Sequence, residues 1–375
     1  MRYRYYLSGI ILFSVLLIII FSPLLLKYLV KRQLLNTFRG STVFLENCVL
    51  KPTEFRIDNL KINKEKTYNF EIKELSIRFN LFSLLKRRII KCRIEGGSLF
   101  INFSNLIDEF KNGINKSNLW RIETIEFKNI ALNSEARDGD LKAYLFFAQL
   151  KPIEKLIHSL KLEISSLSFQ RWEWKDMVLE IKEGGGGNLE VKSLSYGRLK
   201  WEGIKGLINY QKDKLSINPL LVKFLNGDIE GNLDLDWAKT LKYKFFLKIS
   251  HFNLEELEKV FELTEKFKLS GKVEGNFIIE GEGLNFKNIN GEFYIPQPGG
   301  TFIIQDTNLL KKLAEKSGQS FDIISESFRD YYFDKGLIKL FLEGEDLIFR
   351  FILEGEKGKR DLEVRLHNFA NLKIK

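Results

Sequence analysis

The stretch FRIDNLKI, residues 55–62, is the first of six copies of one eight-residue pattern, apolar-x-apolar-x-x-apolar-x-apolar. Each half of the pattern alternates with a period of two, which is typical of a β-strand with one apolar face and one wet face. The two polar residues in the middle would place the second half on the wrong face, so we expect a β-bulge there that bends the strand. The other copies are FEIKELSI (70–77), IEFKNIAL (125–132), LEISSLSF (162–169), LEVKSLSY (189–196) and LKISHFNL (247–254).

The chain after residue 40 consists of short alternating runs divided by turns. Turn signals such as Glu95-Gly96-Gly97, Asn226-Gly227-Asp228 and Glu343-Gly344-Glu345 separate short alternating runs. This spacing predicts an all-β, antiparallel, hairpin-linked fold of roughly twenty strands. The helical patterns are few and short, and they are found at 81–86, 253–261, 306–316 and 322–331.

Such short helices would cover only a small part of the apolar face. Two sheets can stack as a sandwich, one sheet can close into a barrel, or an open sheet can leave an apolar trough for something other than protein. The 32 Phe residues suit the lining of a trough and the core of a sandwich equally well. Periodicity alone leaves all three arrangements open.

The first forty residues form a separate segment. Leu7 to Leu26 is an uncharged run of twenty residues, long enough to cross a bilayer core as a helix. A cleaved signal peptide is the alternative, but the run is too long for one and the first Ala of the chain is Ala131. We therefore expect a single-pass transmembrane anchor followed by a weakly amphipathic juxtamembrane segment, with residues 1–40 as one domain.

The net charge of +10 is concentrated near this anchor, because the first forty residues hold six Lys/Arg and no acid. A membrane anchor argues against nucleic acid as the partner. Basic residues close to a bilayer favour anionic headgroups instead. We expect six of them to face headgroups or the membrane surface: Lys31, Arg32, Arg39, Lys86, Arg87 and Arg88. For the second cluster, an ordinary solvated turn is an equal alternative.

The sequence lacks the patterns of catalytic and metal sites. The three histidines lie in different segments, and neither HExxH, GxSxG nor a Walker motif occurs. Carboxylate pairs such as Asp234/Asp236 and Glu354/Glu356 alternate along strands, which predicts that they face water beside Lys neighbours. Cys48 and Cys92 have no CxxC spacing and are interpreted as buried thiols or one disulfide. We expect no enzyme activity, no cofactor and no metal.

Three stretches carry a resemblance to a known family. A single N-terminal span leads into FRIDNLKI…FEIKELSIRFNLFSLLKRRIIKCRIEGGSLFINF (55–103), which resembles the opening module of the AsmA-like envelope proteins. LKISHFNLEELEKVF…GEFYI (247–295) is similar to a later module, and GGTFIIQDTNLLKKLAEK…YYFDKGLIKLFLEG (299–344) resembles the C-terminal part of the YdbH-like, TamB-related branch. The likeness is one of apolar patterning and glycine placement.

The resemblance implies a short family member in the bacterial inner membrane, single-pass, with its large domain in the periplasm. It implies a long, twisted antiparallel sheet curled into an open apolar groove, with a repetitive β-groove at 41–295 and a C-terminal β region with short helices at 296–375. The implied function is lipid binding and transfer of phospholipid toward the outer membrane, with another copy or an envelope protein as a partner. The rival hypothesis is a scaffold for envelope or outer-membrane protein biogenesis whose apolar face closes on itself as a β-sandwich.

The third and sixth positions of the repeats face the apolar side. We expect these twelve residues to line a lipid groove: Ile57, Leu60, Ile72, Leu75, Phe127, Ile130, Ile164, Leu167, Val191, Leu194, Ile249 and Phe252. Binding there would come from the burial of acyl methylenes without directional contacts.

Overall fold

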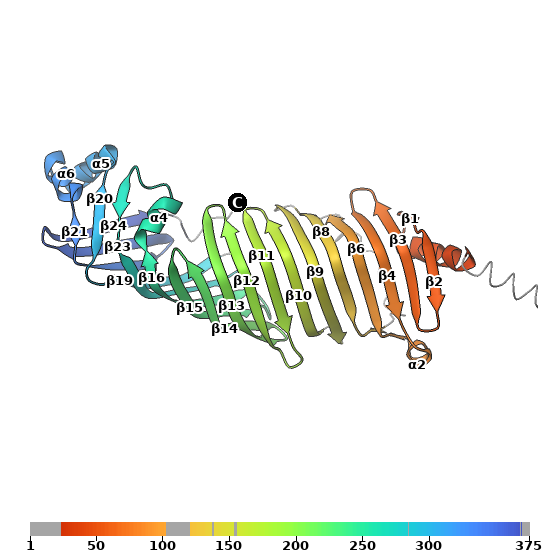
Figure 1. Ribbon diagram of the computed structural model, residues 1–375. Coiled ribbons are helices and arrows are strands. Elements are labelled where there is room, and N and C mark those ends of the chain that lie inside the picture. The colour runs from red at the N-terminus through yellow and green to blue at the C-terminus, as the bar shows by residue number, and fades with distance from the viewer. Residues whose placement is uncertain are drawn as a thin grey trace, which may run out of the picture. The chain divides into compact units, whose positions relative to one another are not determined.

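The computed structural model describes residues 24–102, 121–136, 139–153, 156–283, 285–367 and 369. The chain divides into two compact units, Met1–Glu180 and Ile181–Lys375. The described residues form 24 strands and a few helices, and nineteen of the strands belong to one sheet (Figure 1). The prediction of a mostly β protein with few helices is confirmed.

Unit 1 is built around a sheet in which β1 and β2 lie end to end along β3, followed by β4, β6, β8, β9 and β10. Its strands are β1 (Thr42–Phe44), β2 (Asn47–Lys51), β3 (Glu54–Lys64), β4 (Tyr68–Arg78), β5 (Arg88–Ile89), β6 (Lys91–Asn102), β7 (Arg121–Ile122), β8 (Ile125–Ala136), β9 (Gly139–Ile153) and β10 (Leu156–Phe169). Strand β11 (Trp172–Ile181) contains the division between the units.

The prediction of an entirely antiparallel sheet is wrong at one place in unit 1. Strands β6 and β8 run parallel, with Cys92 opposite Ile125 and Ile101 opposite Ser134. Parallel neighbours need a crossover connection of about a dozen residues or more, whereas a hairpin joins antiparallel ones. Residues 103–124 supply that connection, and they include the short strand β7, which itself pairs parallel with β5.

The six repeats lie in strands β3, β4, β8, β10, β12 and β16, as predicted, with only Leu254 beyond its strand. The middle residues keep both apolar halves on one face in two different ways. The register shifts by one residue at Ser250–His251 of β16 and at Ser165 of β10, which is the predicted bulge. The prediction of a bulge is wrong for the repeats in β3, β4 and β8, because the register runs unbroken from β3 to β9. There Asn59, Gly96 and Asn129 turn the chain by adopting positive φ values of 50°, 68° and 52°.

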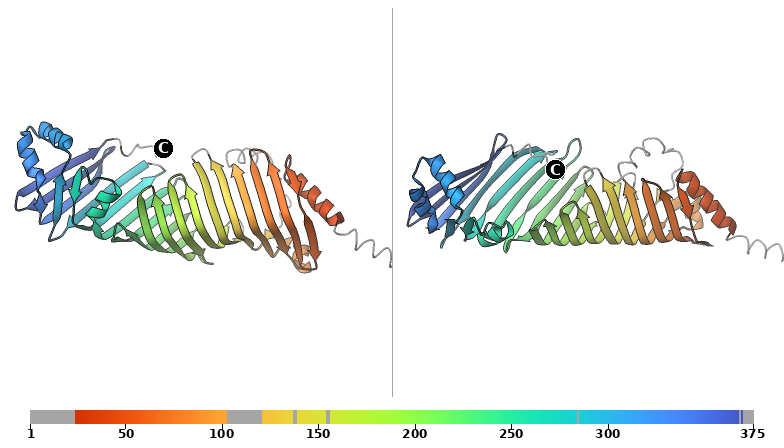
Figure 2. Two further views of the ribbon diagram at one scale, coloured as in Figure 1. Left: turned by 45° about the horizontal axis from the view of Figure 1, so that its top comes forward. Right: turned by 90° about the horizontal axis from the view of Figure 1, so that it is seen from above.

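A helix of residues 24–37 covers the β1–β4 end of unit 1 (Figure 2). Its residues Leu26, Val30 and Leu34, spaced four apart, pack with Phe38 against a buried cluster. The cluster comprises Val43, Leu45, Cys48, Ile57, Leu60, Ile62, Tyr68 and Ile72. The expected amphipathic segment therefore forms. Of the apolar residues Leu34, Leu35 and Phe38, which suit a membrane surface, Leu34 and Phe38 pack against the sheet instead and Leu35 is exposed.

Unit 2 contains an antiparallel series of strands in the order β12, β13, β14, β15, β16, β18, β19, β22, β23 and β24. These are β12 (Gly186–Tyr196), β13 (Leu199–Gln211), β14 (Lys214–Phe224), β15 (Gly227–Asp236), β16 (Lys242–Asn253), β18 (Lys272–Glu282), β19 (Asn285–Ile295), β22 (Lys335–Glu343), β23 (Asp346–Gly355) and β24 (Gly358–Leu366). A small second sheet comprises β17 (Phe267–Leu269), β20 (Gly300–Ile304) and β21 (Tyr332–Phe333).

The predicted helices of unit 2 form, within two residues of the predicted bounds. They are α4 (Leu254–Val260), α5 (Thr307–Ser317) and α6 (Phe321–Arg329), which gather at the β20–β21 end of the unit (Figure 1). Asn253 caps α4 by accepting from the N–H of Glu255, and Asp306 caps α5 by accepting from Asn308 at 2.8 Å. Leu309, Leu310 and Leu313 of α5 join one hydrophobic cluster with residues of α6 and β20, and they form the apolar face of the helix.

One face of the unit 2 sheet has glycines among bulky apolar residues along one cross-strand row. A single row of cross-strand partners reads Leu189, Gly206, Leu220, Gly231, Leu247, Phe277, Gly291, Leu340, Phe349 and Val364. A Cβ added at Gly291 would lie 2.8 Å from the Phe293 ring and 3.1 Å from the Phe277 ring. The missing side chain of Gly291 therefore leaves room for the rings of Phe293 and Phe277.

The predicted transmembrane run lies largely outside the described residues. Within them, no helix is both long enough and apolar enough to cross a membrane. The domain divisions expected after residues 40 and 295 stay predictions.

Candidate functional site

The apolar face of unit 1 brings the predicted lining residues into continuous cross-strand rows. We call the face that carries Ile57 and Leu60 the inner face of unit 1. One row reads Ile57, Leu75, Ile94, Phe127, Ala148 and Leu162, and the next reads Leu60, Ile72, Gly97, Ile130, Leu145 and Ile164. Leu167 lies in a third row, opposite Ala143. All eight predicted lining residues of unit 1 therefore share one face.

Burial along this face is uneven. Ile57, Leu60 and Ile72 belong to the cluster beneath the helix of residues 24–37, and Leu75 packs against that cluster. Farther along the sheet, Ile130 and Ile164 are buried, whereas Phe127 and Leu167 remain partly exposed. The N-terminal third of the predicted lining is thus covered by the protein's own helix.

In unit 2 we call the face that carries Ile229 and Ile249 the inner face. Val191 is buried opposite Ile204, and Leu194 lies opposite Trp201, whose ring stacks on Phe224 at 5.0 Å. Ile249 is partly exposed between Ile229 and Gly275. Phe252 packs near the β21 end, against the cluster that holds the fully buried Tyr331.

The middle of the unit 2 inner face is apolar but only half-buried. Its members on β15, β16 and β18 all retain partial exposure: Leu233, Leu235, Phe245, Leu247, Phe277 and Ile279. Their register makes them direct neighbours, since Phe245 lies opposite both Leu233 and Ile279. An ordinary sandwich core would bury such positions almost completely.

The opposite, outer face is charged and laced by ion pairs between neighbouring strands. Lys61 lies 3.3 Å from Glu71 in unit 1, and Lys339 lies 3.6 Å from Glu292 in unit 2. The predicted water-facing carboxylates are confirmed, because Asp236 pairs with Lys214 at 3.3 Å and Glu354 with Lys335 at 2.9 Å. This contrast assigns one wet and one apolar side to each unit.

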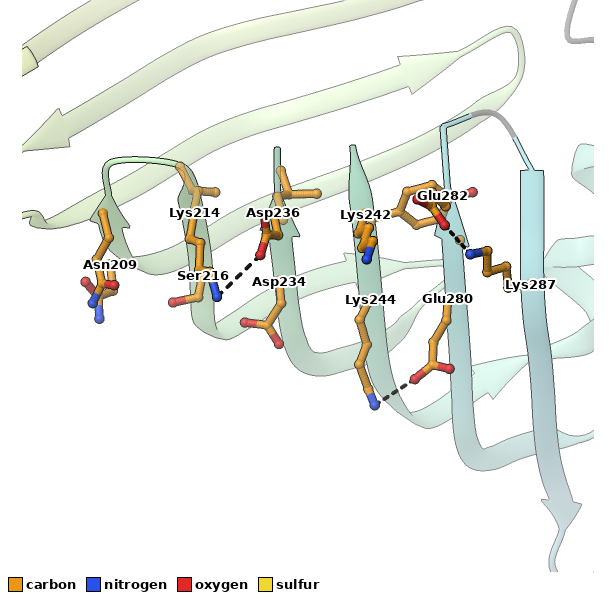
Figure 3. A pocket seen from close by; sticks show the side chains of 15 residues that line it. Asn209, Lys214, Ser216, Asp234, Asp236, Lys242, Lys244, Glu280, Glu282 and Lys287 are labelled. Atoms are coloured by element: carbon orange, nitrogen blue, oxygen red, sulfur yellow. Dashed lines mark hydrogen bonds and ion pairs between the residues drawn. The ribbon is translucent and has the colours of Figure 1, made fainter. Parts of the chain in front are cut away.

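A polar cavity of about 600 Å³ lies at the ends of strands β13 to β19 in unit 2 (Figure 3). Four cations and four carboxylates line it in paired columns: Lys214, Lys242, Lys244, Lys287, Asp234, Asp236, Glu280 and Glu282. Lys244 pairs with Glu280 at 2.7 Å. Hydrogen bonds from Lys287 and Thr240 lower the pKa of Glu282 to about 2.

The balance of charge in this cavity favours internal pairing over the binding of an ion. Sequence reasoning did not single it out, although the alternation of Lys on β14 and β16 with acids on β15 and β18 was visible. Such alternation is typical of solvated cross-strand pairs. Within the described residues, no group of three His, Cys, Asp or Glu side chains could hold a metal ion.

Glu126 forms a buried polar cluster on the outer face of unit 1. Its carboxylate lies 2.5 Å from Lys91 Nζ and 3.1 Å from Arg93 Nε, and accepts from Gln149 at 3.0 Å. Burial alone would raise the pKa of Glu126, but hydrogen bonds from Lys91 and Arg93 outweigh it and lower the pKa. Because these neighbours occupy the carboxylate oxygens of Glu126, the cluster stabilises the contact between strands β6, β8 and β9.

The six basic residues predicted to face lipid headgroups lie mostly on the surface of unit 1. Lys31, Arg32, Arg39, Lys86 and Arg87 are exposed, whereas Arg88 is half-buried and pairs with Glu123 at 2.5 Å.

His251 is exposed at the bulge with φ of 58°. For Cys48 and Cys92 the sequence predicts either buried thiols or one disulfide. Both are free thiols, and Cys48 is buried whereas Cys92 is half-buried. Burial raises the pKa of both.

Comparison of the chain with family models, with curated proteins and with solved structures finds no match.

Proposed function

We propose that this protein is a membrane-anchored lipid-binding and lipid-transfer protein of the bacterial envelope. Acyl chains of phospholipid would lie along the apolar inner face, in an open groove of the curled sheet, with headgroups in water. The phospholipid would move between an inner-membrane anchor and the outer membrane, with the large domain in the periplasm. Assembly with a second copy or an envelope protein belongs to the same proposal.

The observation that carries this proposal is the half-buried apolar surface in the middle of unit 2. Leu233, Phe245 and Ile279 are adjacent on three strands and each keeps part of its side chain exposed. A contiguous apolar surface that keeps partial contact with water is a candidate binding surface. Because polar groups are sparse among these neighbours, the ligand it suits is an apolar chain.

The energetics favour a ligand held without directional contacts. Each acyl methylene removed from water contributes about 0.8 kcal/mol, so a dozen methylenes on this face would contribute on the order of 10 kcal/mol before losses of chain and rigid-body entropy. Such binding tolerates sliding along the face, because neighbouring apolar positions are nearly equivalent. That property is what transfer along a surface requires.

The resemblance to AsmA-like proteins supports the same reading. The rival function, a scaffold for envelope protein biogenesis with a closed β-sandwich, is favoured by one feature. The helix of residues 24–37 closes the inner face over Ile57 and Leu60 as an ordinary core. The proposal therefore assigns lipid to the stretches of the inner face that lack such a cover.

Two adjacent phenylalanines on β16 provide the test. Phe245 points to the inner face, opposite Ile279, whereas Phe246 lies on the outer face, opposite Ile278, and is exposed. The photoreactive residue p-benzoylphenylalanine replaces each in turn in the full chain, expressed in bacterial cells and irradiated there. Mass spectrometry of the purified protein should find phospholipid adducts with Phe245→p-benzoylphenylalanine and far fewer with Phe246→p-benzoylphenylalanine.

Charge substitutions extend the test from binding to transfer. Phe245→Glu should abolish lipid adducts at a second inner-face probe, such as one at Ile279, while Phe246→Glu should leave them unchanged. Equal adduct yields on both faces, or none on either, would count against the lipid groove and favour the scaffold.

A further inference from the structure

The short helix α2 (Leu81–Leu85) presents the most exposed apolar side chains among the described residues of the protein. Leu81, Phe82 and Leu85 are 72%, 75% and 76% exposed. At positions i, i+1 and i+4 they occupy one face of the helical turn. Large apolar side chains clustered at such exposure mark an interaction surface.

The turn is held rigidly, so the exposure is not that of a loose loop end. Asn80 Oδ1 accepts from the N–H of Ser83 at 2.7 Å, and the N–H of Asn80 donates to Ser83 Oγ at 2.9 Å. This reciprocal capping box fixes the start of the helix. The N–H of Phe79 donates to the carbonyl of Thr53 at 3.0 Å, which ties the base of α2 to the β2–β3 turn.

Positive charge follows the apolar face directly. Lys86 and Arg87 are exposed at the end of α2, and Lys51 is exposed at the end of β2. Glu54 at the start of β3 pairs with Arg78 at 3.7 Å, and Glu123, which follows β7, pairs with Arg88 at 2.5 Å. An apolar tip bordered by cations is complementary to a surface with an apolar interior and anionic headgroups.

We propose that α2 is a membrane-contact element whose Leu81, Phe82 and Leu85 enter the interfacial layer of a bilayer that contains anionic lipid. Lys86 and Arg87 lie at the level of the headgroups. This inference rests on the membrane anchor of the proposed function and does not depend on lipid transfer. It gives unit 1 a second attachment to the bilayer besides the anchor.

A bilayer is favoured over a protein partner by what else lies at this end of unit 1. Figure 1 shows α2 at the end that also carries β2 and the helix of residues 24–37. That helix continues the uncharged run 7–26, and on the side away from the sheet it exposes Leu25, Tyr28 and Leu29. Two apolar surfaces at one end of a unit, one of them continuous with a membrane-length run, have a bilayer as their common partner.

The test places p-benzoylphenylalanine at Phe82 in the full chain, reconstituted into vesicles of phosphatidylcholine with or without phosphatidylglycerol. The matched control is Phe146, a 58% exposed phenylalanine on β9 of the same unit. Irradiation should give lipid adducts at position 82 and few at 146. In vesicles that lack the anionic lipid, or with Lys86→Glu and Arg87→Glu, the yield at 82 should fall about fivefold or more.

Each other outcome overturns the proposal. Similar lipid adducts at 82 and 146 would mean that α2 has no special contact with the bilayer. Adducts between position 82 and protein would identify a protein partner, and a yield independent of anionic lipid would remove the headgroup contacts. The vesicle comparison needs no charge variant, so misfolding of that variant leaves the test intact. The probe at Phe245 reports lipid on the inner face separately, so the two proposals can fail independently.

Discussion

Ile57 and Ile249 occupy the same third position of two copies of one repeat, yet their surroundings differ. Ile57 lies in a core closed by the helix of residues 24–37 and is 2% exposed. Ile249 lies between Ile229 and Gly275 and remains partly exposed. The same local pattern therefore gives a core residue in unit 1 and a half-buried residue in unit 2.

The comparison teaches that the strand pattern determines which face is apolar but not what covers it. The cover in unit 1 comes from Leu26, Val30 and Leu34, which precede the first strand in the chain. Periodicity within a strand contains no information about such a partner, because a covered and an uncovered face have the same alternation.

The largest effect on stability is expected from alanine substitution of Ile57, compared with the same substitution at Ile249. Ile57→Ala should lower the free energy of unfolding by about 2–5 kcal/mol, because it leaves a cavity in a closed core. Ile249→Ala should cost about 1 kcal/mol, since its side chain already contacts water. Urea unfolding of the full chain in detergent, followed by circular dichroism, measures both. Equal losses would mean that the unit 2 face is as closed as that of unit 1.

The next largest loss of stability is expected at a buried carboxylate of the outer face, with an outer-face carboxylate that is less buried as the control. Glu126→Gln should destabilise the protein by about 1.5–3 kcal/mol, because Lys91 and Arg93 lose a buried charged acceptor. The exposed Glu280, paired only with Lys244 and Asn288, provides the control, and Glu280→Gln should change little.

The pH dependence follows from the lowered pKa of Glu126. A folded-state pKa below the unfolded value adds stability that is present above about pH 4.3 and is lost as the pH falls toward the folded pKa. The difference between Glu126→Gln and the unmodified protein should therefore be largest at neutral pH and shrink below about pH 4. A difference that grows on acidification would contradict the assigned ion pairs.

A smaller effect tests how far the unit 2 face is filled by its own side chains. Gly291→Ala should cost about 1–2 kcal/mol, because the new Cβ would lie 2.8 Å from the Phe293 ring and displace it. Gly283 in the β18–β19 turn has positive φ but open space around it, so Gly283→Ala separates backbone strain from crowding. If Gly291→Ala has no effect, the ring is loose and the face is open there as well.

The smallest effect is expected on the solvated side. Lys244→Ala removes the ion pair with Glu280 at 2.7 Å, and both groups are exposed, so the urea midpoint should not shift measurably. A clear shift would show that the paired columns of the polar cavity contribute to the stability of unit 2.

Much of the fold could be predicted from the sequence, because the signals were local. The six repeats gave the strands and the face of each lining residue, and Asn253 and Asp306 marked the starts of α4 and α5. The parallel pairing of β6 and β8 was missed, since the choice depends on a crossover rather than on either strand. The cover over Ile57 was missed for the same reason, as the stripe of Leu34 and Phe38 fits a sheet and a bilayer equally well.

The inner-face site shows the same limit. Register brought Leu60, Ile72 and Ile130 into one row, as the pattern required. The half-buried surface around Phe245 depends on how far the other described residues cover it and could be found only in three dimensions.

The left-handed residues Asn59, Gly96 and Asn129 have a mechanical consequence. They lie in one cross-strand row on β3, β6 and β8, so the strands bend at the same height. Flattening the sheet would require all of these backbones to leave their wells together, and the resistance would add strand by strand. The aligned positive-φ residues therefore hold the bend of the unit 1 sheet at this height of the strands.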